Sequence, residues 1–182
     1  MVRWDVAFAG WIERTHTETG EAIFSAGSWL GAPVLGLLVV VVLVTFAVKR
    51  DWLHAGALSI TAAGGWLLNQ ALKLIFHRGR PEQAAEFIHR TSWSFPSGHS
   101  MSSTVCYGFL LYLALERVTD VRRRRALIAG TAAVVFFVGV SRLYLGVHYL
   151  SDVVGGFLAG AAWLMACTAG YRLVVARRRS GV

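Results

Sequence analysis

The sequence predicts an all-α, polytopic membrane protein with about five transmembrane helices, an N-terminal interfacial helix and an active site at the outer membrane face. Three observations support this prediction. Hydrophobic residues make up 55% of the 182 residues and charged residues only 15%, against about 25% charged residues in soluble domains. Several apolar runs approach the roughly 20 residues that cross a bilayer. Arginines gather in short bursts beside these runs, as the positive-inside bias predicts.

The net charge and the cysteines exclude other classes of protein. The formal net charge is +8, but its arginines flank apolar segments, so we expect no nucleic-acid partner. Cys106 and Cys167 lie inside apolar runs, and we interpret them as small buried hydrophobes rather than as a disulfide or metal framework. The first residues lack the pattern of a removable signal peptide.

The N-terminal segment, residues 1–28, is amphipathic and too polar to span a membrane. Trp4 and Trp11 stand among charged residues, which is typical of a helix lying in the membrane interface. We expect a bend near Gly27 and Ser28. A loosely ordered tail remains an open alternative for this segment.

The expected spans share long apolar runs that stop at polar or basic residues. They cover residues 30–48, 54–76, 100–115, 126–140 and 150–175. Basic bursts at 49–50, 122–125 and 177–179 mark the predicted cytoplasmic ends. We expect one domain over residues 1–182, with the helical bundle at 30–175. Glycine pairs at 27/31 and 156/160 predict close helix contacts.

The most informative polar stretch lies between the last two spans. Arg142, His148 and Asp152 stand there, close to apolar runs, and ionisable groups at a membrane boundary indicate a functional site. In a helix His148 and Asp152 share one face. Asp152 then accepts the Nδ1 proton of the imidazole and leaves Nε2 as a nucleophile or base. Alone, this pattern fits several chemistries.

Two further polar segments are predicted at the same membrane face. The cations Lys73, Arg80 and Arg142 suit a phosphate better than a single carboxylate. A helix that begins at Ser97-Gly98-His99 directs free N–H groups towards the same anion. In this arrangement His148 attacks phosphorus, and His99 gives a proton to the departing oxygen.

These segments resemble the three-part signature of the type 2 phosphatidic acid phosphatase superfamily, bacterial membrane branch. The matching motifs are Lys73-x6-Arg80-Pro81, Pro96-Ser97-Gly98-His99 and Ser141-Arg142-x5-His148-x3-Asp152. The resemblance covers about residues 30–175 and implies a metal-independent, cofactor-free lipid phosphate phosphatase that forms a phosphohistidine. It implies His148 as the nucleophile, Asp152 as its orienting partner and His99 as the acid. The residues implied to hold the phosphoryl oxygens are Lys73, Arg80, Ser97, Gly98 and Arg142.

The physiological substrate is the open question. Predicted outward topology in the cytoplasmic (inner) membrane of a bacterium favours undecaprenyl pyrophosphate, converted to undecaprenyl phosphate. Phosphatidylglycerol phosphate and phosphatidic acid are alternatives, because they share the phosphate that the motifs recognise. A lipid phosphotransferase that uses the same site is a further alternative. The non-enzyme alternative is a lipid transporter or binding protein. The partners expected are the lipid substrate and the bilayer; the sequence does not predict an oligomeric state.

Several residues near the motifs have simpler explanations. Snorkelling to lipid phosphates is an open explanation for Arg78 and Arg90. The histidines outside the motifs are expected to be interfacial or solvated; they are His16, His54, His77 and His89. Trp93 and Phe95 are expected either to line the site or to anchor the predicted loop at 77–95.

Overall fold

Residues 3–81 and 92–180, the part of the chain that the computed structural model describes, form seven α-helices and contain no strand. The all-α prediction is confirmed. In chain order the helices are α1 (Arg3–Arg14), α2 (Glu18–Trp29), α3 (Pro33–Val48), α4 (Trp52–Phe76), α5 (Gly98–Leu115), α6 (Val121–Tyr144) and α7 (Leu150–Arg179). The five expected spans correspond to α3 to α7.

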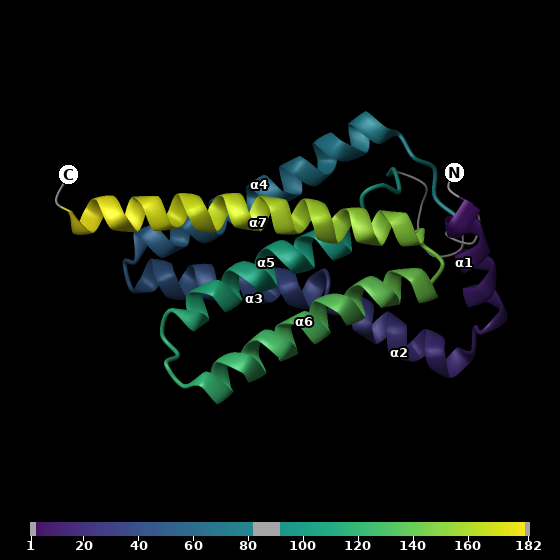
Figure 1. The fold of residues 1–182 in the computed structure, drawn as a ribbon, viewed down its shortest axis with the longest axis horizontal. Coiled ribbons are helices and arrows are strands. Elements are labelled where there is room, and N and C mark those ends of the chain that lie inside the picture. The colour runs from purple at the N-terminus through teal and green to yellow at the C-terminus, as the bar shows by residue number, and fades with distance from the viewer. Residues whose placement is uncertain (1–2, 82–91, 181–182) are drawn as a thin grey trace.

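Helix α5 is the centre of the bundle, in contact with α3, α4, α6 and α7. Figure 1 shows α7 along most of the length of the molecule, with α5 beside it. The core residues of α5 include Met101, Val105 and Phe109, which are all at most 1% exposed. Long apolar side chains on one helix therefore hold four neighbours together.

Glycines allow α7 to approach α5 closely. A Cβ atom at Gly156 would lie 2.7 Å from the carbonyl oxygen of Ser97, and one at Gly160 would lie 3.0 Å from that of Met101. The first distance is too short for a side chain, and the second is tighter than most Cβ contacts. The predicted close contact of this glycine pair is confirmed, and it presses the start of α7 against the start of α5.

Three stretches in the described chain are long and apolar enough to cross a membrane: Glu18–Val48, Val121–Tyr144 and Leu150–Arg178. Helices α4 and α5 lie where two more spans were expected but fall short on hydropathy. They carry polar motif residues, such as Lys73 and His99, which lower their mean hydropathy. The protein is thus a helical membrane protein, with fewer uniformly apolar helices than the expected five.

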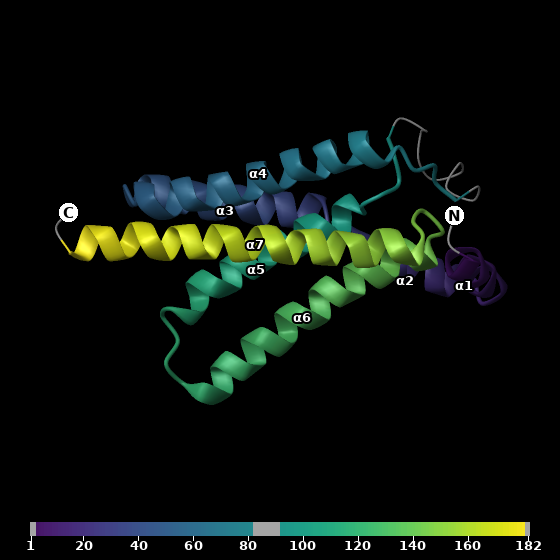
Figure 2. The ribbon, with the colours of Figure 1, turned by 45° about the horizontal axis from the view of Figure 1, so that its top comes forward.

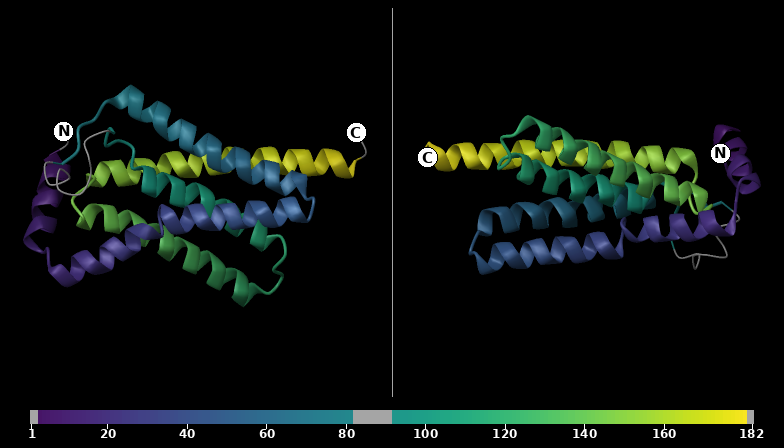
Figure 3. Two further views of the ribbon diagram at one scale, coloured as in Figure 1. Left: turned by 180° about the vertical axis from the view of Figure 1, so that it is seen from behind. Right: turned by 90° about the horizontal axis from the view of Figure 1, so that it is seen from below.

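The N-terminal segment differs from the expected single interfacial helix. It forms two helices, and α2 leads into α3 after a short break at residues 30–32, where Pro33 starts the new helix (Figure 3). The bend therefore lies a few residues after Gly27 and Ser28. Helix α2 packs on α6, so residues 18–29 extend the first apolar stretch. Helix α1 lies across the end of the bundle (Figure 2).

The two ends of the bundle differ in chemistry. The α3–α4 turn, the α5–α6 connection and the C-terminal end of α7 lie together at one end (Figure 1), and this end carries the basic bursts at 49–50, 122–125 and 177–178. The opposite end holds the C-termini of α4 and α6 and the N-termini of α5 and α7. The polar motifs all lie there.

Candidate active site

Four helix ends bring the three motifs together. Lys73 is in the last turn of α4, and His99 is in the first turn of α5. Arg142 is in the last turn of α6, and Asp152 is in the first turn of α7. Helices that run antiparallel alternate their termini at each end of a bundle. Segments nearly 80 residues apart in sequence therefore meet at one end.

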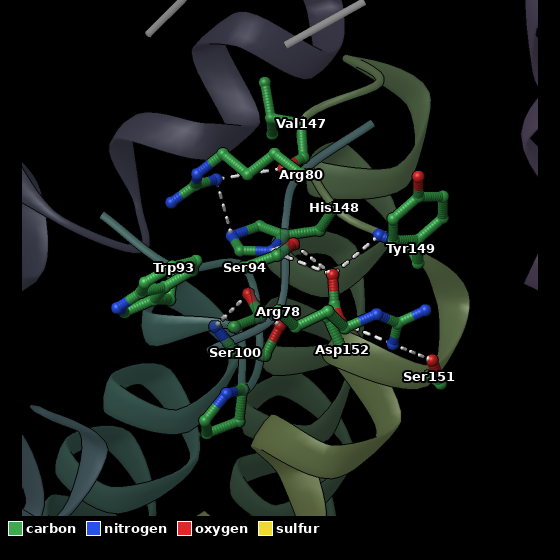
Figure 4. Close-up of polar contacts among 12 residues, drawn as sticks. Arg78, Arg80, Trp93, Ser94, Ser100, Val147, His148, Tyr149, Ser151 and Asp152 are labelled. Carbon is green, nitrogen blue, oxygen red and sulfur yellow. Dashed lines mark hydrogen bonds and ion pairs between the residues drawn. The ribbon is translucent and has the colours of Figure 1, made fainter. Parts of the chain in front are cut away.

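His148, in the connection between α6 and α7, forms a buried pair with Asp152 in the first turn of α7. Gly146 has φ 63°, a left-handed conformation that glycine adopts without strain, and it reverses the chain after α6. Nδ1 of His148 lies 3.4 Å from Oδ2 of Asp152. The same carboxylate oxygen accepts a hydrogen bond of 2.9 Å from the Tyr149 N–H. Figure 4 shows the imidazole directed towards this carboxylate.

Burial sets the protonation state of His148. Its side chain is surrounded by protein, and this burial lowers the pKa of His148 from 6.5 to about 4, although the hydrogen bond that its ring donates to Asp152 acts in the opposite direction. The neutral imidazole has one protonated nitrogen and one free lone pair. Because Nδ1 faces the carboxylate, the geometry assigns the lone pair to Nε2.

Arg80 lies beside that lone pair. Its Nη1 is 3.4 Å from Nε2 of His148 and donates to the carbonyl oxygen of Val147 at 2.9 Å. Two further hydrogen bonds, of 3.1 and 3.0 Å, join the guanidinium to the carbonyl and hydroxyl oxygens of Ser92. Burial lowers the pKa of Arg80 below its ordinary value. A guanidinium held by these contacts beside the lone pair of His148 is suited to an anionic ligand.

A single cavity of about 650 Å³ joins these groups to an apolar wall. Its apolar part lies along α3 and α4 and includes Leu35, Val39, Val40 and Trp66. Six of the eight sequence-predicted site residues line its polar part: Lys73, Arg80, Gly98, His99, Arg142 and His148. We call this space the site cavity.

Ser97 and Asp152 lie behind the wall of the site cavity. Ser97 is fully buried and caps α5, because its hydroxyl oxygen accepts from the Ser100 hydroxyl at 3.1 Å and faces the Ser100 N–H at 3.5 Å. Its own N–H donates to the carbonyl oxygen of Asp152 at 2.9 Å. Ser97 therefore joins the starts of α5 and α7, while Gly98 presents the backbone to the cavity.

Two buried cations are anchored from behind. Nζ of Lys73 donates to the carbonyl oxygen of Trp93. Nη1 of Arg142 donates to the hydroxyl of Ser28 in α2, and its buried Nε has no hydrogen-bond partner among the described residues. A buried N–H without a partner is costly, so this Nε is a donor available to a ligand.

Sequence reasoning missed four polar residues around the pair. Ser94 is fully buried, donates to Oδ2 of Asp152 and lies 3.3 Å from Nδ1 of His148. Arg78 contacts Asp152, and Asp5 contacts Arg78. Ser28 contacts Arg142. Arg78 forms an ion pair with Asp152 and does not extend to lipid, which decides its open interpretation.

The remaining local expectations have mixed outcomes. Phe95 anchors the connection, because it packs on Phe76, with ring centroids 4.8 Å apart, and on Gly155. His54 is partly buried and hydrogen-bonded to Asp51 and Tyr171, so it is not simply solvated. Arg90 and His89 lie outside the described residues. Within residues 3–81 and 92–180, no three His, Cys, Asp or Glu side chains cluster as metal ligands; metal independence remains a prediction.

Comparison with known proteins decides the family. Residues 52–175 match the model of the PAP2 superfamily, and this range contains all eight predicted site residues. The chain belongs to the PAP2 superfamily.

Known PAP2 proteins support the same class of activity. The chain is 37% identical over 146 residues to phosphatidylglycerophosphatase B of Bacillus subtilis, covering 78% of this chain and 68% of the relative. It is 30% identical over 172 residues to human dolichyldiphosphatase 1, covering 87% and 71%. The crystal structure of a transmembrane PAP2-type phosphatidylglycerolphosphate phosphatase from Bacillus subtilis has a TM-score of 0.82 and 26% identity, covering 93% of this chain and 85% of that one. The protein is a membrane-embedded lipid phosphate phosphatase of the PAP2 type.

Proposed function

We propose that this PAP2 phosphatase removes the terminal phosphate of a long-chain lipid phosphate through a phosphohistidine on His148, and that its main substrate is undecaprenyl pyrophosphate. The proposal rests on the site cavity, in which the cations around His148 continue into an apolar wall on α3 and α4. A phosphate head and a hydrocarbon tail need these two environments side by side.

The first step is transfer of the phosphoryl group to His148. Nε2 attacks phosphorus while Asp152, on the Nδ1 side, stabilises the positive charge that develops on the ring. An N–P bond forms and the P–O bond to the lipid breaks. His99 lines the same cavity and gives a proton to the departing oxygen. With a pyrophosphate substrate, the departing group is the lipid monophosphate.

The second step returns the enzyme to its free state. His99 accepts a proton from a water molecule whose oxygen attacks phosphorus. The N–P bond breaks, and inorganic phosphate leaves. In both steps the equatorial oxygens face the cations Lys73, Arg80 and Arg142, whose charge stabilises the transition state. The Gly98 N–H at the start of α5 adds a backbone donor.

One observation and one proposal favour the diphosphate lipid. Dolichyldiphosphatase 1 is a relative whose name specifies a diphosphate, and the proposed outward access, from the face opposite the basic bursts, suits a lipid carrier that is recycled at the outer face. Phosphatidylglycerol phosphate is the second candidate, because phosphatidylglycerophosphatase B is 37% identical to this chain. Both lipids offer a terminal phosphate to the same cluster.

A panel of lipid phosphates tests the proposal. Purified protein is incubated with undecaprenyl pyrophosphate, phosphatidylglycerol phosphate or phosphatidic acid, with and without EDTA, and phosphate release is measured. We expect the highest kcat/KM for undecaprenyl pyrophosphate, no loss with EDTA, and no activity for His148→Ala. His16→Ala is the matched control, since His16 is exposed and outside the site cavity. If another lipid gives a higher kcat/KM, that lipid is the main substrate and the proposed one is wrong. If the phosphate is transferred only after an acceptor lipid is added, the enzyme is a phosphotransferase.

A further inference from the structure

Helix α1 directs one buried carboxylate towards the candidate active site. Asp5 is 2% exposed, whereas Trp4 on the same helix is 79% exposed. Its Oδ1 accepts a hydrogen bond of 2.9 Å from the Ser151 N–H, and its Oδ2 accepts one of 2.6 Å from the Ser151 hydroxyl. Burial would raise the pKa of Asp5, but these hydrogen bonds and Arg78 outweigh burial and lower it. Asp5 is therefore an ionised group next to the first turn of α7.

Arg78 connects this carboxylate to Asp152. Its Nη2 donates to Oδ2 of Asp5 at 2.6 Å, and its Nη1 donates to Oδ1 of Asp152 at 2.8 Å and to the Ser151 hydroxyl. The guanidinium also lies over the Tyr149 ring, 4.6 Å from its centroid. Figure 4 shows Arg78 between Asp152 and Ser151. One guanidinium thus bridges a carboxylate of α1 and the partner of His148.

The two oxygens of Asp152 have separate tasks. Oδ1 is held by Arg78, while Oδ2 faces Nδ1 of His148 and accepts from the Tyr149 N–H. Rotation of the carboxylate would break both sets of contacts, so the direction of Oδ2 depends on Arg78. The direction of Arg78 in turn depends on Asp5, which accepts the hydrogen bond from its Nη2.

We propose that Asp5 and Arg78 are positioning residues of the reaction, which makes helix α1 a part of the active site. They act through Asp152, and neither of them lines the site cavity. This inference rests on the proposed function, in which Asp152 orients His148.

The opposite charges of Asp5 and Arg78 give the proposal an electrostatic signature. Removing the positive charge of Arg78 makes protonation of His148 easier, and removing the negative charge of Asp5 makes it harder. The charged or titratable groups around His148 include Asp5 on α1, Lys73 on α4, Arg78 and Arg80 in the connection after α4, His99 on α5, Arg142 on α6 and Asp152 on α7. The experiment changes only Asp5 and Arg78, so the charges of the other groups stay constant.

The experiment compares Asp5→Asn and Arg78→Gln in the full-length purified enzyme. Two controls accompany them: Glu13→Gln removes an exposed charge from the same helix, and Leu58→Ala destabilises the buried core away from the site. For each variant, kcat, KM, the melting temperature and the pH dependence of kcat/KM are measured.

We expect a decrease in kcat on the order of tenfold for both site variants, the effect of a small misplacement of a catalytic group, with little change in KM. The acid midpoint of kcat/KM moves to lower pH in Asp5→Asn and to higher pH in Arg78→Gln, and the double variant lies between them. Neither control moves the midpoint. Leu58→Ala lowers only the melting temperature. This control therefore distinguishes an effect on positioning from an effect on stability.

Two results overturn the inference. The first is a wild-type kcat in both variants. The second is a decrease in kcat that follows the decrease in melting temperature, with an acid midpoint that does not move or that moves in the same direction in both variants. Because the variants can also fold poorly, Asp5→Glu, which keeps the charge, is added and is expected to keep the wild-type midpoint. His148→Ala and Asp152→Asn are assayed in parallel. Activity in those two variants refutes the proposed function, whereas their inactivity beside a normal Asp5→Asn and Arg78→Gln refutes only the positioning role.

Discussion

Ser28 of α2 accepts a hydrogen bond from Nη1 of Arg142 in α6, a contact between residues 114 positions apart. Both side chains are buried, at 9% and 7% exposure. Nε of Arg142 has no partner among the described residues, so the contact with Ser28 fixes one donor of the guanidinium while another stays available to a ligand. Helix α2 lies outside the signature motifs, yet it helps to determine the orientation of a proposed phosphate-binding arginine.

Ser28→Ala should therefore weaken phosphate binding. The variant removes one hydrogen bond to a charged group, which is worth about 1.5 kcal/mol or more, so we expect KM and the inhibition constant of vanadate to rise about tenfold. Ser25→Ala, one turn earlier in the same helix, should leave both constants unchanged. Equal constants in Ser28→Ala and wild type would show that Arg142 is held by other contacts.

Ser94→Ala should lower kcat more than it raises KM. Its hydroxyl donates to Oδ2 of Asp152 and lies 3.3 Å from Nδ1 of His148, so its loss leaves both groups less constrained. We expect a decrease in kcat of about tenfold to a hundredfold. The matched control is Ser103→Ala, because Ser103 is equally buried and its hydroxyl has no partner among the described residues. Steady-state kinetics on both variants test this; similar kcat values for the two would contradict it.

The pH dependence of the reaction should reflect the burial of His148. Burial lowers the pKa of His148 to about 4, so the imidazole stays neutral as the pH falls from 7 to about 5 and becomes protonated near pH 4. Protonation removes the nucleophilic lone pair. We expect kcat/KM to fall with a midpoint near pH 4 that is common to two substrates whose phosphates ionise differently. A common midpoint near 6.5 would mean that His148 titrates as an exposed histidine.

The apolar wall of the site cavity should select for long lipid chains. Gly36 lines this wall, and a Cβ atom built there meets no atom within 4 Å. Gly36→Leu should therefore fill the cavity without distorting the helices, and raise KM for a long-chain lipid by about tenfold, the effect of roughly 1.4 kcal/mol. KM for a short-chain phosphate should stay constant. Gly130→Leu is the control, because Gly130 is equally unobstructed but lies on α6, outside the cavity. An unchanged ratio between the two lipids would place the tail elsewhere.

Most of the bundle follows from local sequence signals. One apolar run ends just before Lys49, where α3 ends at Val48. Another begins just after Arg125, within a few residues of the start of α6 at Val121. The main difference concerns residues 18–29, whose glutamates suggested a segment too polar to span. Those glutamates lie in the first turn of α2, and the rest of the helix packs on α6.

The motif residues were predictable because each has a fixed spacing within its own segment. Asp5, Arg78 and Ser94 have no such signal. Asp5 meets Ser151 across 146 positions, and Ser94 meets Asp152 across 58, so only the packing of α1 and of the connection before α5 brings them to the site. Tertiary contacts of single polar residues leave no periodic pattern in a sequence.

The proposed outward orientation places the start of α2 and the start of α6 on opposite sides of the membrane. Thr17, just before α2, hydrogen-bonds to Tyr144 at the site end of α6, while Arg123 lies at the other end of α6 in a basic burst. In a variant without Cys106 and Cys167, single cysteines at Glu18 and Arg123, both exposed, are treated with a membrane-impermeant thiol reagent on intact cells. We expect Glu18→Cys to be labelled directly and Arg123→Cys only after permeabilisation, because basic segments remain on the cytoplasmic side. The reverse pattern would place the site at the cytoplasmic face and remove the main argument for undecaprenyl pyrophosphate over phosphatidylglycerol phosphate.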